Sequence, residues 1–152
     1  MASKPQTWKP TDTTVNVPGV GTVACHAEYQ SSEDEGGQHY VDRTNATGGG
    51  WVKNQRTVWT VTVHFEGYAM SSPYTQGSAY DAPPKADSVL YSLASDASGA
   101  DATFEDFCSD YGYDNDSRTA ERTWDACRET ELQLRRMFGP KYDDVQKWSY
   151  GQ

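Results

Sequence analysis

One segment constrains the fold more than any other: residues 57–65, where apolar and polar side chains alternate. Trp59, Val61, Val63 and Phe65 hold every second position, and polar residues stand between them. Because the side chains of a strand point alternately to its two faces, this segment predicts a strand with one buried and one polar face.

The residues on either side predict two hairpins. Glu66 and Gly67 suit a two-residue turn, and the expected cross-strand pairs are Phe65 with Tyr68, Val63 with Met70 and Trp59 with Tyr74. Pro73 indicates that the return strand lies at an edge of the sheet or ends there. A second hairpin is expected over 15–29, with its turn at Pro18-Gly19 and one face formed by Val23, Cys25, Ala27 and Tyr29.

The segment between these hairpins, residues 30–50, has the composition of a loop. It contains the acidic run 33–35, the pair Gly36-Gly37 and three more glycines at 48–50, and it can bury almost nothing. It therefore predicts a mobile loop. A loop this long is either functional or a solvated connection, and solvation is the simpler account.

The second half of the chain has helical spacing. After the linker 81–84, Val89, Leu90 and Leu93 predict a helix over 86–97. A short helix is expected from residue 104 to Gly112, with Thr103 or Asp101 as its N-cap. A long helix from the caps at 114–117 to residue 138 and a last short helix over 141–149 complete the pattern.

These patterns predict an α+β fold, an N-terminal antiparallel sheet of about four strands followed by three to four helices. The 152 residues are expected to form one domain over 1–152, with a β-rich half at 13–76, a helical half at 84–149 and the loop at 30–50. No apolar run reaches 18 residues and the first residues are polar, so neither a membrane helix nor a signal peptide is expected. Three widely spaced cysteines favour reduced thiols in a cytosol.

Negative charge is concentrated in one part of the chain. Residues 86–121 contain nine acidic residues and one basic residue, Arg118, so this segment carries −8 of the formal net charge of −9. Such a surface could bind a basic groove of another protein in place of nucleic-acid phosphates. Helix capping and solvation explain some of the same residues, because carboxylates stabilise the first turn of a helix.

Catalytic and metal chemistry have little support in the sequence. Cys25 and His26 are neighbours on a predicted strand and point to opposite faces, which prevents a dyad. No Cys or His pair has zinc spacing, and Asp110, Asp114 and Glu121 fit a calcium loop poorly. Phosphate-binding and nucleophile-elbow motifs are absent. We therefore expect a protein that is not an enzyme and that has no cofactor, no catalytic residue and no metal site.

Direct binding to nucleic acid is disfavoured by the pI near 4.6, because such binding depends on Lys and Arg displacing counterions. The alternative of a nucleic-acid-binding accessory protein would use aromatic residues in the loops and the arginines of the long helix. Those arginines stand near acidic residues, so intrahelical pairs are the simpler account.

One stretch has a family resemblance. Leu-Tyr-Ser-Leu-Ala-Ser-Asp-Ala-Ser-Gly at 90–99 is followed by Phe-Glu-Asp-Phe-Cys at 104–108, Tyr-Gly-Tyr-Asp at 111–114 and Leu-Arg-Arg-Met-Phe-Gly at 134–139. This combination, over roughly residues 88–139, resembles small uncharacterised proteins of tailed bacteriophages. The resemblance implies a phage accessory protein. Small acidic proteins of that kind are often inhibitors of host machinery, restriction and CRISPR nucleases included.

The leading hypothesis is an anti-CRISPR-like inhibitor in the host bacterial cytoplasm. Its partner would be a bacterial effector protein, a nuclease or a CRISPR complex, bound by a monomer or homodimer without direct nucleic-acid or membrane contact. A minor structural component of the phage is a further alternative. The predicted partner-binding residues are Asp101, Glu105, Asp106, Asp110, Tyr111, Tyr113, Asp114 and Asp116.

Overall fold

The computed structural model describes residues 8–41, 50–77, 82–100, 103–112 and 117–152. It contains a four-stranded antiparallel sheet in sequence order, β1 (Thr11–Val17), β2 (Gly21–Val41), β3 (Gly50–Phe65) and β4 (Tyr68–Gln76). The strands precede α1 (Ala86–Gly99), α2 (Phe104–Tyr111), α3 (Arg118–Phe138), the 3-10 turn η1 (Gly139–Lys141) and α4 (Tyr142–Tyr150). The predicted α+β class is confirmed.

Both predicted hairpins are present. The register of β3 and β4 has the three expected pairs, Phe65 with Tyr68, Val63 with Met70 and Trp59 with Tyr74. Glu66 and Gly67 have φ angles of 47° and 80°, the left-handed values that a tight type I′ turn requires. β4 is an edge strand, which accommodates Pro73.

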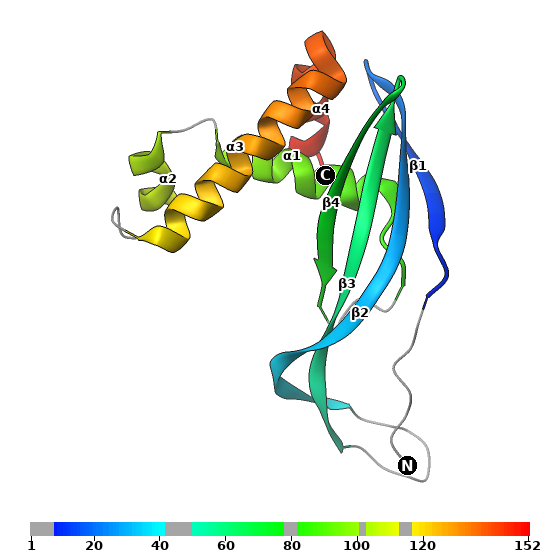
Figure 1. The fold of residues 1–152 in the computed structure, drawn as a ribbon, viewed down its shortest axis with the longest axis vertical. Helices are drawn as coiled ribbons and strands as arrows, with labels where there is room; N and C mark the ends of the chain where they lie inside the picture. The colour runs from blue at the N-terminus through cyan, green and yellow to red at the C-terminus, as the bar shows by residue number, and fades with distance from the viewer. Residues whose placement is uncertain (1–7, 42–49, 78–81, 101–102, 113–116) are drawn as a thin grey trace.

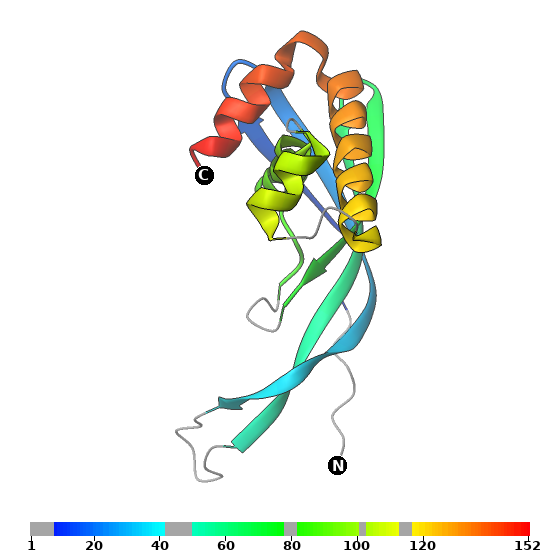
Figure 2. The ribbon, with the colours of Figure 1, turned by 90° about the vertical axis from the view of Figure 1, so that its left-hand side faces the viewer.

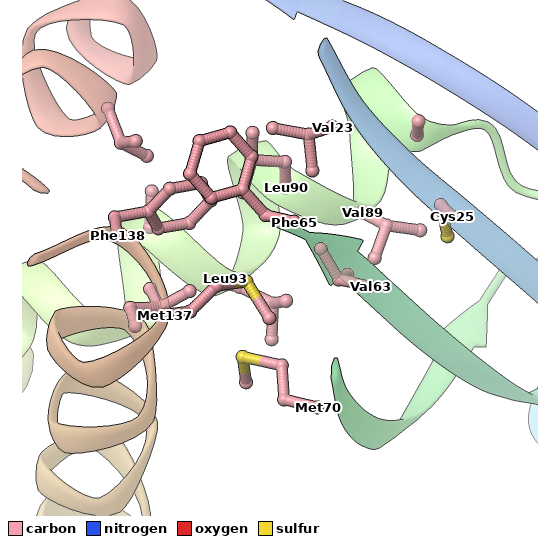
Figure 3. Packing of buried hydrophobic residues seen from close by; sticks show 14 of the residues in the cluster. Val23, Cys25, Val63, Phe65, Met70, Val89, Leu90, Leu93, Met137 and Phe138 are labelled. Atoms are coloured by element: carbon pink, nitrogen blue, oxygen red, sulfur yellow. The ribbon is translucent and has the colours of Figure 1, made fainter. Parts of the chain in front are cut away.

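The helices cover one face of the sheet (Figures 1 and 2). The alternating residues of β3 point to this side, and Trp59, Val61 and Val63 are each 1% exposed. Figure 3 shows how the core closes at the end of β3, where the rings of Phe65 and Phe138 have centroids 4.9 Å apart. Each predicted strand thus buries the face that its sequence pattern indicates. None of the described helices has the length and hydropathy needed to cross a membrane.

Short polar contacts define where the helices begin and end. The Thr13 hydroxyl of β1 accepts a 2.8 Å hydrogen bond from the Ala86 N–H at the start of α1. Thr103 caps α2 and Ser117 caps α3, each accepting from the N–H three residues later. Gly112 ends α2 with a φ angle of 75°.

The predicted loop at 30–50 is wrong for most of its length. β2 continues to Val41 and β3 starts at Gly50, so only residues 42–49 of it lie outside the described residues. From Glu33 opposite Arg56 to Val41 opposite Gly50, the two strands form a two-stranded extension, called the arm below, which projects beyond the helices (Figure 2). The pairing is irregular between Asp34 and Gln38, where Gly36 and Gly37 have positive φ angles.

We predict that Leu90→Ala lowers the free energy of unfolding by about 2–5 kcal/mol, because the leucine is 1% exposed and its removal leaves a cavity beneath β3. Urea denaturation measures the change. Leu132→Ala removes the same atoms from a side chain that is 47% exposed, so its effect should be well below that of Leu90→Ala. Equal losses in the two variants would contradict the assignment of α1 to the core.

Candidate partner-binding surface

The predicted acidic surface is centred on α2, which lies at the end of the helical layer farthest from the sheet (Figure 1). Phe107 and Cys108 are buried, and the Phe104 ring packs on Trp124 of α3 with centroids 5.4 Å apart. One face of this helix is therefore anchored on α3, and the opposite face is left to solvent.

Three of the predicted residues lie on this solvent face. Glu105, Asp106 and Asp110 are exposed, and among the described residues no cation forms an ion pair with any of them. Tyr111 is the last residue of α2. The other predicted contacts, Asp101, Tyr113, Asp114 and Asp116, lie outside the described residues.

Helix capping explains only part of this charge. Glu105 and Asp106 stand in the first turn of α2, where a carboxylate is favoured by the helix dipole. Asp110 stands in the last turn, which has no basic residue, and lies four positions after Asp106. Both its place at the negative end of the dipole and its repulsion from Asp106 oppose helix stability. Asp110 is therefore the carboxylate that the stability of α2 does not explain.

Two of the five arginines of α3, Arg128 and Arg135, are engaged within the chain. The guanidinium of Arg128 lies 4.8 Å from the centre of the Trp124 ring. Arg135 pairs with Glu131 at 3.3 Å and lies over Tyr142. The expectation of intrahelical pairs is confirmed for Arg135, whereas Arg128 stacks on an aromatic ring instead. These two side chains are therefore less available for a nucleic-acid face lined by arginines.

The thiols have the properties of structural cysteines. Burial, with a smaller contribution from Asp12, raises the pKa of Cys25 to about 11. Burial and then Asp96 raise the pKa of Cys127. Both thiols stay protonated at neutral pH and lack the thiolate character of a nucleophile. Within the described segments, no group of three or more His, Cys, Asp or Glu side chains is arranged to hold a metal ion.

A second charged cluster, which the sequence analysis missed, lies on the open face of the sheet. His26 Nδ1 is 2.8 Å from Oδ1 of Asp12, and His26 Nε2 is 3.1 Å from Oε1 of Glu28. The two strands are joined by residues 18–20, and this connection places Asp12 opposite His26. A two-residue turn at Pro18-Gly19 would instead place Asp12 opposite Cys25, so the predicted turn did not indicate the cluster. The bond to Glu28, followed by that to Asp12, raises the pKa of His26 above its ordinary value of 6.5.

Comparison with known proteins identifies no relative of this chain. No known protein family matches the chain, and neither a curated protein nor a solved structure shows significant similarity to it.

We predict that Asp110→Lys stabilises the protein by about 0.3–1 kcal/mol, because it removes a carboxylate from the negative end of a helix and places a cation there. Thermal and urea unfolding measure the change. Glu105→Lys is the matched control at the other end of α2, where the same reversal should be destabilising. Destabilisation by Asp110→Lys would show that its carboxylate has a structural role.

We predict that NMR titration gives His26 a pKa above 6.5 and that Glu28→Gln lowers it, because the carboxylate favours the protonated ring. The stability that this cluster adds is present at low pH, below the unfolded value, and is lost as pH rises through the folded pKa. Glu129→Gln on α3 is the control and should leave the titration unchanged. A pKa of 6.5 or lower would contradict the cluster.

Proposed function

We propose that the protein is a non-enzymatic inhibitor that binds a basic surface of another protein through the exposed face of α2. The contact residues within the described chain are Glu105, Asp106 and Asp110. The predicted contacts Asp101, Tyr111, Tyr113, Asp114 and Asp116 extend the same surface in sequence.

The observation that carries this proposal is the position of Asp110. A carboxylate kept at the C-terminal end of a short helix, next to another acid, costs the helix stability and has no partner among the described residues. An interface with a basic partner supplies a reason for that charge. Unpaired surface carboxylates also attract a basic partner over distance and speed its association.

The class of partner follows from the phage resemblance at 88–139. A phage protein with an acidic surface, whose thiols Cys25 and Cys127 have raised pKa values, fits the inhibition of a host nuclease or CRISPR effector, whose nucleic-acid groove is basic. The carboxylates would occupy positions that phosphates take in the natural substrate. The proposed site of action is the cytoplasm of the host bacterium.

A pull-down of the tagged full chain from lysates that contain defence systems, with mass spectrometry, identifies the partner. We predict that the double reversal Asp106→Lys with Asp110→Lys lowers affinity for that partner at least about tenfold, and that binding of the unaltered protein weakens as salt rises. Isothermal titration or biolayer interferometry measures both effects.

The control is Asp87→Lys with Asp143→Lys, which makes the same change in net charge at exposed positions on α1 and α4. This control should retain most of the affinity. If the two double variants bind equally well, α2 is not the contact surface.

A second candidate, a minor structural component of the phage, is favoured by a different feature. The arm projects from the sheet without helical cover, as an assembly element would. Large homogeneous assemblies of the purified protein on size exclusion would favour this function over inhibition.

A further inference from the structure

The arm leaves part of β3 without a neighbouring strand. Within the described residues, β4 pairs with β3 only from Phe65 to Thr57, where Gln76 ends the pairing. Among the described residues, the only strand paired with residues 50–56 of β3 is β2. A two-stranded ribbon is marginal in water, and an open strand edge is a template for another strand.

A large aromatic side chain stands near the far end of this open edge. Trp51 is opposite Tyr40 in the register and is 69% exposed. Exposed tryptophans are typical anchors of protein interfaces, since each brings a large apolar area with little loss of conformational freedom.

A groove lies at the near end of the same edge, where β4 stops. It has a volume of about 700 Å³, within the range that accepts a small ligand or a large side chain. Its walls come from the end of β4, the linker and one face of α1, and they include Tyr74, Gln76, Pro83, Tyr91 and Ser95. Tyr91 on its rim is 43% exposed.

We propose that the arm is a dimerisation element and that its occupant is a second copy of this chain. Residues 50–56 of the two copies pair antiparallel about a two-fold axis, which passes near Lys53 at the middle of the stretch. Residues 50–56 of each copy then pair with the part of β3 that β4 does not cover in the other copy. This arrangement is self-complementary because a two-fold axis lets both copies contribute the same stretch of strand to the interface.

The same two-fold axis brings the aromatic anchor to the groove. In this pairing Trp51 of one copy lies beside residue 55 of the other. That residue is two positions from Thr57, and Thr57 pairs with Gln76, the last residue of β4. Since a strand rises about 3.4 Å per residue, the indole reaches the mouth of the groove, which includes Gln76. Two indoles and their grooves supply on the order of half of the ~1,200 Å² that a stable interface buries, and the paired strands supply the rest.

The charge of the paired stretch gives this interface a distinct salt response. Residues 50–56 contain Lys53 and Arg56, and Arg56 is bound by Glu33 at 2.9 Å and 3.0 Å. Glu33 offsets the charge of Arg56, so Lys53 gives the stretch its net positive charge. In the dimer the two positively charged stretches repel each other, and screening by salt should strengthen the dimer. The proposed acidic interface on α2 responds in the opposite direction, so the two proposals fail separately.

Sedimentation velocity of the full chain tests the dimer. We expect a monomer–dimer equilibrium in the micromolar range, tightened by salt, and a loss of affinity of tenfold or more in Trp51→Ala. Tyr150→Ala is the matched control, because it removes an aromatic ring that is 73% exposed and lies on α4. A monomer at 100 µM, or equal dimerisation of both variants, would overturn the proposal.

Two further variants test the geometry. Tyr91→Ala should weaken the dimer, and the double variant with Trp51→Ala should lose less than the sum of the single losses, since the two side chains share one contact. Lys53→Cys should be joined between copies by a short bismaleimide, whereas Lys147→Cys on α4 should not. Additive losses, or equal cross-linking of the two cysteine variants, would exclude this pairing.

Discussion

The rest of the structure depends on the packing of α1 against the inner face of the sheet. The residues Trp59, Val61 and Val63 of β3 are buried on this inner face, and α1 packs against β1, β2 and β3 with its own Val89 and Leu90 fully covered. This contact fixes which face of the sheet is dry. It thereby determines which faces of α3 and α4 turn inward and leaves α2 and the arm as the parts that project.

Features that involve a buried face could be predicted from the sequence. Alternation in β3 and the turn at Glu66-Gly67 together determine the β3–β4 register, and Thr103 could be recognised as a cap. The arm could not be predicted, because a two-stranded ribbon satisfies its backbone hydrogen bonds without burying a side-chain face, so its polar composition resembles that of a loop. The groove beside Tyr91 is formed jointly by α1, the linker and the end of β4, an arrangement in space that no local sequence pattern encodes.

The two candidate interfaces lie in separate parts of the molecule. The acidic face of α2 is at one end of the helical layer, and the arm leaves the sheet beyond the helical cover (Figures 1 and 2). The body between them is held by apolar packing and by interactions such as that of Lys141 with Glu66 and the Val20 carbonyl. A dimer joined through its arms would therefore present two acidic surfaces at once, and binding to a partner with repeated basic sites would gain from avidity.

The order of strands has a consequence for synthesis of the chain. Among the described residues, each strand pairs only with its neighbours in sequence, so this sheet is complete before residue 77. Such local topology favours rapid formation of the hairpins. Yet the apolar face of the sheet has no cover until α1 has left the ribosome, and Trp59 and its neighbours are exposed during that interval. The β-rich half alone is thus expected to aggregate when translation is interrupted between β4 and α1.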